Sequence, residues 1–145
     1  MPQQRVNKEQ RRRVIKRANG VCEYCYSQMA YSSDPFNAEH IIPRSRDGVT
    51  ALHNLALACF GCNNKKWTYV TGLDFITQSS APLYHPRQDR WADHFEWSAT
   101  HTILLGLTPT GRATIDLLEL NRQGVVNLRR VLYAHGDHPP YPIDD

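Results

Sequence analysis

Residues 39–66 read EHIIPRSRDGVTALHNLALACFGCNNKK and hold most of the side chains in the chain that can do chemistry. A carboxylate stands beside a histidine, an asparagine follows, and a Cys-x-x-Cys pair is followed at once by a further asparagine. These residues are Glu39, His40, Asn54, Cys59, Cys62 and Asn63. Such a mixture of oxygen, nitrogen and sulfur ligands in one short segment indicates a reactive or metal-binding site rather than packing alone.

A second Cys-x-x-Cys pair, Cys22 and Cys25, lies upstream, with 33 residues between Cys25 and Cys59. The chain has four cysteines, which is the full ligand count of a closed tetrahedral zinc site. The alternatives to a zinc site are two buried cysteine pairs or a redox pair. A thioredoxin-like redox pair usually lies in a βαβ unit, which the sequence does not show. We therefore predict one structural Zn²⁺ that contributes folding energy to a small core.

The length of 145 residues predicts one domain. Its expected parts are a basic helix at 1–20, a zinc-stapled core at 21–68 and a C-terminal extension at 69–145. No apolar run approaches the roughly 20 residues of a membrane helix, and no apolar segment follows the basic start as in a signal peptide. We therefore expect a cytoplasmic protein with no membrane partner.

Positive charge is concentrated at the N-terminus. Residues 1–20 hold seven basic side chains against the single acid Glu9, a net +6, whereas the whole chain is only +3. This concentration favours contact with a polyanion, the alternative being a merely soluble helix. The candidate nucleic-acid contacts are Arg11, Arg12, Arg13, Lys16, Arg44, Arg46, Lys65 and Lys66, although each of the last four could equally be a solvated surface charge.

Hydrophobic periodicity and turn residues predict an α+β fold. A helix is expected at 7–19, strands at 38–42 and 55–58, and a helix from about 62 to 67, which together make a helix followed by a ββα unit. The predicted extension has a loop-rich segment at 70–90, a hairpin at 94–98 and 102–105, a helix opened by Thr108 and Pro109, and a helix at 123–133.

Glu39 and His40 are adjacent in a predicted strand, and neighbouring residues of a strand point to opposite faces, so the two would not ordinarily share a site. They could still share a site at the end of a strand, and Pro43 lies close by. Asn63 is expected near the start of the following helix, beside the cysteine cluster. A hard divalent ion such as Mg²⁺ could then lie between the oxygen ligands Glu39 and Asn63.

From Cys22 to about Lys66 the chain resembles the HNH endonucleases of the zinc-stapled ββα-metal type. The shared order is a cysteine knuckle, an acid-His-Ile-x-Pro run, an asparagine, a second knuckle, and an asparagine with lysines. The family motif reads His40, Asn54 and Asn63 here, an HNN variant, with Glu39 where the family more often has Asp. The segments PLYHPRQDRWADHFEW (82–97) and GLTPTGRATIDLLELNR (106–122) also look like an extension of some small HNH proteins.

The resemblance implies a metal-dependent endonuclease that hydrolyses DNA phosphodiester bonds. His40 would be the general base, Glu39 and Asn63 would hold Mg²⁺ or Mn²⁺ on the scissile phosphate, and Asn54 would orient His40 or brace the loop. A catalytically inactive zinc-stabilised nucleic-acid-binding module is the alternative, and a nuclease for RNA or a toxin-like effector is a third possibility.

Overall fold

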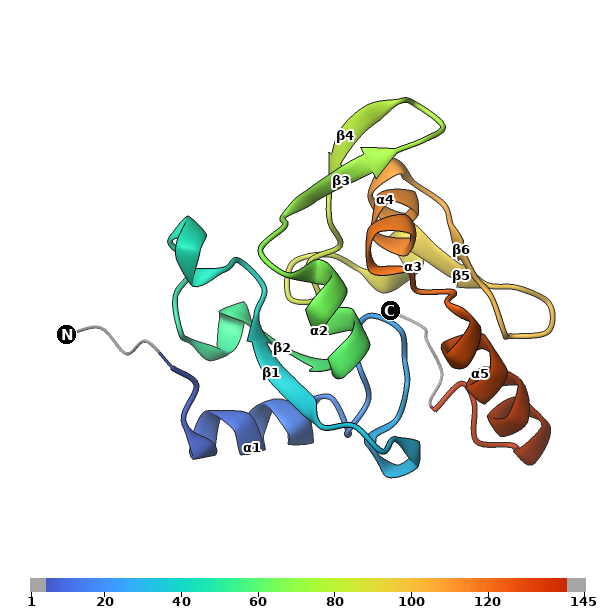
Figure 1. Ribbon diagram of the computed structural model, residues 1–145, viewed down its shortest axis with the longest axis horizontal. Coiled ribbons are helices and arrows are strands. Elements are labelled where there is room, and N and C mark those ends of the chain that lie inside the picture. The colour runs from blue at the N-terminus through green and yellow to red at the C-terminus, as the bar shows by residue number, and fades with distance from the viewer. Residues whose placement is uncertain (1–4, 141–145) are drawn as a thin grey trace.

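An antiparallel strand pair followed by a short helix forms the centre of the computed structural model, which describes residues 5–140 (Figure 1). Strand β1 (Phe36–His40) pairs with β2 (Leu55–Cys59), and α2 (Phe60–Lys66) follows directly. Every residue of β2 is buried, because α1 (Lys8–Arg17) and α2 both contact the pair. The predicted ββα unit is therefore confirmed, with β1 starting two residues earlier than the sequence indicated.

Local capping signals define α1. The side chain of Asn7 accepts a hydrogen bond from the Gln10 backbone, and the Gln10 side chain accepts one from the Asn7 backbone, which makes a capping box. At the other end Asn19 takes a left-handed φ of 54°, and the Gly20 N–H donates to the Ile15 carbonyl. This C-terminal motif ends the helix at Arg17, two residues before the predicted end.

The segment predicted as loop-rich contains a hairpin, so that prediction was wrong. Strand β3 (Thr71–Asp74) pairs with β4 (Ser79–Pro82). The Asp74 carboxylate accepts hydrogen bonds from the turn backbone at Ile76 and Thr77, and it forms an ion pair with Arg112 at 2.8 Å. The hairpin thus depends on a residue 38 positions away, which local sequence patterns cannot reveal.

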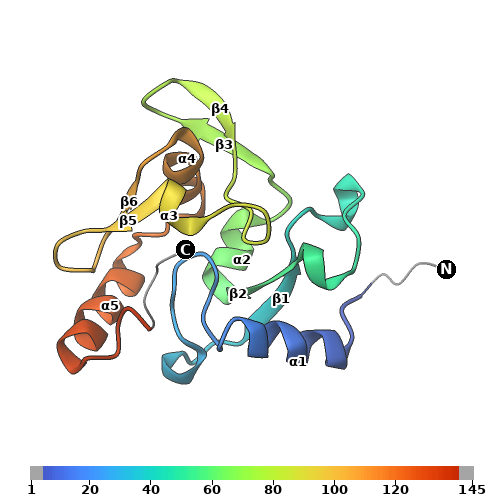
Figure 2. The ribbon, with the colours of Figure 1, turned by 180° about the vertical axis from the view of Figure 1, so that it is seen from behind.

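Apart from a short helix that was not predicted, the rest of the extension follows the predicted order. Helix α3 (Trp91–His94) leads into β5 (Phe95–Trp97), which pairs with β6 (Leu104–Gly106). Helices α4 (Pro109–Leu118) and α5 (Gln123–His135) come next, and the Thr108 side chain caps α4 as expected. Figure 2 shows the β3–β4 hairpin, the β5–β6 hairpin and α4 grouped on the side of the molecule away from α1.

Aromatic side chains of the extension pack into the core. Trp91 and Phe95 are 6% and 3% exposed, and Trp91 meets Tyr26 edge to face with ring centroids 5.6 Å apart. Trp91 and Phe95 are therefore packing residues, and the Trp97 ring lies against Trp91 with centroids 6.0 Å apart. The apolar stripe of α5 is only partly buried, because Val131 is exposed while Arg129 is buried instead.

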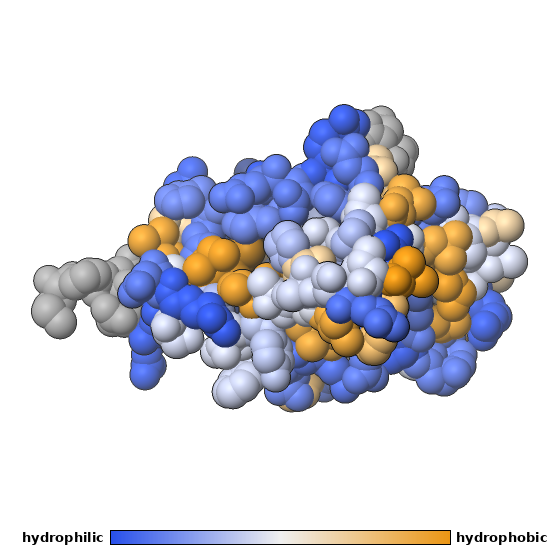
Figure 3. All heavy atoms as spheres, turned by 90° about the horizontal axis from the view of Figure 1, so that it is seen from above, coloured by the Kyte–Doolittle hydropathy of each residue, from blue (hydrophilic) through white to orange (hydrophobic). Residues whose placement is uncertain are grey.

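Figure 3 shows a largely hydrophilic face with several separate apolar patches. Among the residues from 5 to 140, no helix is both long and apolar enough to span a membrane.

Candidate active site

The four cysteines converge on one point. Their Sγ atoms all lie within 4.8 Å of one another, the four residues are buried, and none forms a disulfide. Four thiolates around zinc, each about 2.3 Å from the metal, stand about 3.8 Å apart, and Cys25 and Cys59 Sγ are separated by 3.6 Å. The backbone N–H groups of Cys25 and Cys62 point to the Sγ atoms of Cys22 and Cys59 at 3.5 Å. The cluster fits the predicted structural zinc.

Two arginines of the extension contact this cluster, and sequence reasoning missed both. Arg122 places Nη2 3.3 Å from Cys59 Sγ and Nη1 3.6 Å from Cys62 Sγ. Gly61 makes the approach possible, because a Cβ at that position would lie 2.6 Å from Arg122 Nη2. The second arginine, Arg129, is buried and donates to the Cys25 carbonyl at 3.0 Å.

The charge of these arginines suits a cluster of thiolates. Burial opposes the charged guanidinium of Arg122, but the neighbouring cysteines hold its pKa above the ordinary value. A zinc ion with four thiolates carries a net charge of −2, and the two guanidinium groups supply +2 beside it.

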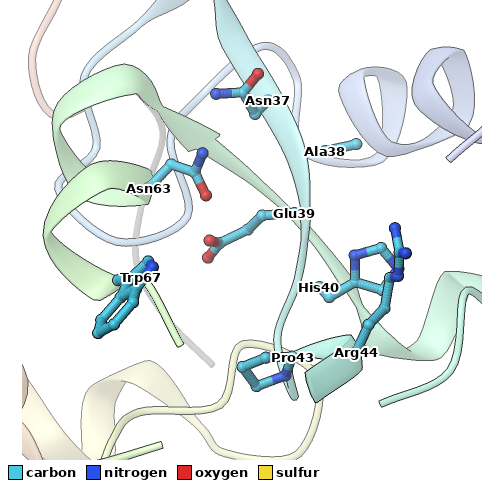
Figure 4. A pocket seen from close by; sticks show the side chains of 8 residues that line it. All are labelled: Asn37, Ala38, Glu39, His40, Pro43, Arg44, Asn63 and Trp67. Carbon is cyan, nitrogen blue, oxygen red and sulfur yellow. The ribbon is translucent and has the colours of Figure 1, made fainter. Parts of the chain in front are cut away.

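Glu39 and Asn63 face each other across a hollow beside the cysteine cluster. Figure 4 shows the Glu39 carboxylate, from β1, pointing toward the Asn63 amide on α2. The hollow has a volume of about 350 Å³. Its lining residues are Asn37, Ala38, Glu39, His40, Pro43, Arg44, Asn63 and Trp67.

The Glu39 carboxylate is buried without a hydrogen-bond partner for one of its oxygens. The residue is 6% exposed, and Oε1 has no partner among the described residues. Burial raises the pKa of Glu39 to about 7, although the nearby Lys66 ammonium lowers it. A buried carboxylate oxygen without a partner is a fitting ligand for a divalent cation, and the Asn63 amide oxygen is a second.

His40 points to the other side of β1, next to Arg44 (Figure 4). Its Nε2 lies 2.8 Å from Thr50 Oγ1, a contact that sequence reasoning missed. Partial burial, together with the positive charge of Arg44, lowers the pKa of His40 below its ordinary value. The imidazole is therefore neutral at physiological pH and can accept a proton.

Asn54 braces the loop between the strands. It is buried, its amide donates to the carbonyls of Ile42 (3.0 Å) and Val49 (2.9 Å), and its oxygen accepts from the Ile42 N–H at 2.9 Å. All three bonds go to backbone groups of the loop that follows β1, and none goes to His40. Of the two roles expected for Asn54, the geometry matches the brace.

The basic residues near the hollow have different surroundings. Arg44 lines the hollow, Arg46 donates to the Thr68 carbonyl at 2.7 Å, and Lys65 forms an ion pair with Glu119 at 2.8 Å. Lys66 does not reach the surface: it is 1% exposed and donates to the Ile41 carbonyl at 2.8 Å. The predicted contact of Lys66 with phosphate is therefore wrong, because its ammonium lies inside the molecule beside Glu39.

The basic residues of α1 divide into those with structural partners and those facing solvent. Arg11 donates to the Phe36 carbonyl at 2.9 Å, and Arg12 pairs with Glu9 at 2.6 Å. Arg17 was not among the residues singled out from the sequence. It donates to the carbonyls of Leu52 and Leu55 and so connects α1 to the core by hydrogen bonds. Arg13 and Lys16 are exposed and, with Glu9, Arg12 and Arg17, line a shallow hollow along α1.

The comparisons with known proteins agree with the geometry of the cysteine cluster and the ββα unit. The family model described as HNH endonuclease matches residues 22–68. No curated protein and no solved structure matches the chain. The matched segment starts at the first zinc cysteine, ends just after α2, and includes Glu39, His40, Asn54 and Asn63. Residues 22–68 therefore form a domain of the HNH endonuclease family, and nucleic acid is the substrate class that such a domain implies.

Proposed function

We propose that this protein is a metal-dependent endonuclease that hydrolyses phosphodiester bonds of DNA. The observation that carries the proposal is the buried Glu39 carboxylate, whose Oε1 has no partner among the described residues and which faces Asn63 in the same hollow that His40 lines. Burying a carboxylate that has only a structural role would cost free energy, whereas binding of a divalent ion offsets the free-energy cost of burying a carboxylate that receives it.

Glu39 and Asn63 would hold Mg²⁺ or Mn²⁺. Two oxygen ligands from the protein would suit Mg²⁺, which is usually bound by one or two protein carboxylates together with water and substrate phosphates. When bound, the ion supplies positive charge to the scissile phosphate and to the leaving oxygen. The role of the protein is to place the two oxygen ligands on separate rigid elements, β1 and α2.

His40 is the proposed general base. We assign the tautomer in which Nε2–H donates to the Thr50 hydroxyl, so that the lone pair is on Nδ1 and that nitrogen accepts the proton of the attacking water. The lowered pKa of His40 keeps the ring neutral, so the base is ready at physiological pH. Thr50 is a positioning residue that fixes the tautomer and the ring.

Positive side chains in the hollow and on α1 support DNA as the polyanion. Arg44 lines the hollow itself, and Arg13 and Lys16 are exposed on α1. We assign the activity to a reducing compartment such as the cytoplasm, because all four cysteines are needed as zinc ligands and none is oxidised to a disulfide.

The test is cleavage of a supercoiled plasmid by the full-length, zinc-loaded protein. Protein freed of loosely bound metal is expected to cut only after Mg²⁺ or Mn²⁺ is added, while its zinc content stays constant. Binding of the plasmid without cutting in either metal would contradict the proposal and would favour a nucleic-acid-binding module.

A further inference from the structure

One large aromatic side chain at the hollow is not used by the proposed mechanism. Trp67 lines the hollow together with Glu39 and Asn63, and yet it is 68% exposed. In Figure 4 its ring stands on the Asn63 side of the Glu39 carboxylate, away from His40 and Arg44. The other two tryptophans, Trp91 and Trp97, belong to the packed aromatic cluster.

The backbone holds Trp67 in this position. The residue is the C-cap of α2, directly after Lys66, and its N–H donates to the Asn63 carbonyl at 3.0 Å. Its φ of 47° lies in the left-handed region, which is an outlier for a bulky aromatic residue. This conformation ends the helix and leaves the indole in solvent, a strained arrangement of the kind that persists at functional sites.

Among residues 5–140, Tyr69 is the aromatic neighbour of the Trp67 ring, which remains largely open. Tyr69 meets it in a T-shaped contact with centroids 5.8 Å apart and planes at 76°, and this contact covers only a small part of the indole. The other lining side chains are mainly polar or charged, as are Asn37, Glu39 and Arg44. A flat aromatic ring isolated among polar groups suits a flat ligand with polar edges and an attached anion better than the apolar core of a protein interface.

We propose that Trp67 stacks on an unpaired nucleobase next to the scissile phosphate, so that this protein prefers strands with an unstacked base at the cleavage site. The inference rests on the proposed function. A phosphate held at Glu39 and Asn63 brings an adjacent base to the Trp67 side of the hollow. A base inside a duplex is covered on both faces by its neighbours and cannot offer a face to the indole, so the preferred substrates are single strands, flaps and mismatched sites.

Binding measurements with cleavage disabled test this stacking. In the full-length His40→Ala background, the affinities for a labelled single-stranded oligonucleotide and for its duplex are measured at one salt concentration with Mg²⁺ present. Trp67→Ala is expected to weaken single-strand binding roughly 5- to 150-fold while changing duplex binding about twofold or less, and Trp67→Phe is expected to restore much of the loss. The matched control is Phe75→Ala, which removes an aromatic ring of similar exposure (64%) in the β3–β4 turn and is expected to change neither affinity.

Tryptophan fluorescence gives a second result that a merely structural role would not produce. A saturating oligothymidylate is expected to quench the emission of the exposed Trp67, and the quenching should disappear in Trp67→Phe, which keeps only the packed Trp91 and Trp97.

Three results would overturn the inference: equal single-strand affinity in Trp67→Ala and its parent, equal losses in Trp67→Ala and Phe75→Ala, or quenching that persists in Trp67→Phe. Metal-dependent plasmid cleavage by the wild-type protein separates this failure from that of the proposed function. Cleavage with any of these results removes the stacking inference alone, whereas absence of both cleavage and nucleic-acid binding removes both.

Discussion

The guanidinium of Arg122 lies 3.3 Å from Cys59 Sγ, although the two residues are 63 positions apart in the chain. Arg122 stands between α4 and α5, so this contact ties the extension to the cysteine cluster of the HNH domain. The same guanidinium also donates to the carbonyls of Leu118 and Glu119 at the end of α4. The extension is thus attached to the HNH domain through the zinc ligands themselves.

Loss of this contact should weaken zinc binding. Arg122→Ala removes the positive charge and the N–H donors beside Cys59 and Cys62, and second-sphere partners of this type typically contribute 10- to 100-fold to metal affinity. We expect zinc transfer to a chromophoric chelator to be faster by about that factor, with Arg122→Lys intermediate. Arg130→Ala is the control, since Arg130 is exposed and contacts Asn127 instead. Unchanged zinc transfer in Arg122→Ala, even with a lower melting temperature, would show that Arg122 only caps α4.

Asn54 is expected to contribute to stability. Asn54→Ala leaves the Ile42 N–H and the carbonyls of Ile42 and Val49 without their partner, and each unsatisfied buried group costs about 1–3 kcal/mol. We expect a loss of about 3 kcal/mol in the free energy of unfolding, measured by urea denaturation. Asn54→Asp should be no better, because it places a carboxylate against two carbonyl oxygens. The exposed Asn127→Ala is the control, with an expected change within about 0.5 kcal/mol. A near-neutral Asn54→Ala would refute the brace.

Glu39 should make stability depend on pH when no divalent ion is present. Burial raises its pKa to about 7, above the ordinary value of 4.5, so the native state holds this proton more tightly than the unfolded state. The contribution of Glu39 to the free energy of unfolding is therefore most favourable below about pH 4.5, and it is lost as the pH rises through about 7. Glu39→Gln removes this dependence.

The measurement is the difference in unfolding free energy between wild type and Glu39→Gln from about pH 5.5 to pH 8, without and with Mg²⁺. Without the ion, the variant should gain on the wild type as pH rises. Added Mg²⁺ should stabilise the wild type at pH 8 and leave Glu39→Gln nearly unaffected, because the variant lacks the charged one of the two proposed ligands. A constant difference across pH, or equal stabilisation of both proteins, would count against Glu39 as the metal ligand.

Arg44 should set the acidic limb of the pH–rate profile. Partial burial is the first cause of the lowered pKa of His40, and the Arg44 charge is the second. Arg44→Ala removes the second cause, so the pKa of His40 should rise and the acidic limb should move to higher pH. The profile is measured at saturating Mg²⁺, where protonation of Glu39 no longer competes with the ion, and Arg130→Ala is the control. An acidic limb that stays in place would contradict the assignment of that limb to His40.

Local signals in the sequence were sufficient for much of this structure. The two cysteine pairs, the capping residues Asn7 and Thr108 and the alternation of strand and helix lead to the ββα unit and to α4 without knowledge of any distant contact. The adjacency of Cys62 and Asn63 in the sequence places Asn63 beside the cysteine cluster, because both residues lie on α2. That the chain is one domain stays a prediction.

Features that depend on distant partners were not predictable. The β3–β4 hairpin needs the ion pair of Asp74 with Arg112, and Lys66 is buried because the Ile41 carbonyl and the Glu39 carboxylate surround its ammonium. The contacts of Arg122 with sulfur and of Thr50 with His40 likewise arise only when the chain has folded. Basic residues in a sequence look alike whether they face solvent or a buried carbonyl, and this is why Lys66 was misassigned.

The most direct test of the account compares cleavage of supercoiled plasmid by His40→Ala and His53→Ala in Mg²⁺. His53 is exposed, and it lies on the same segment between the strands, so its variant controls for loss of a histidine there. Both variants are expected to keep their zinc and melting temperature. We expect His53→Ala to cut like the wild type and His40→Ala to lose at least 100-fold in rate, a typical contribution of a general base. A folded, zinc-loaded His40→Ala protein that cuts at the wild-type rate would contradict the central claim.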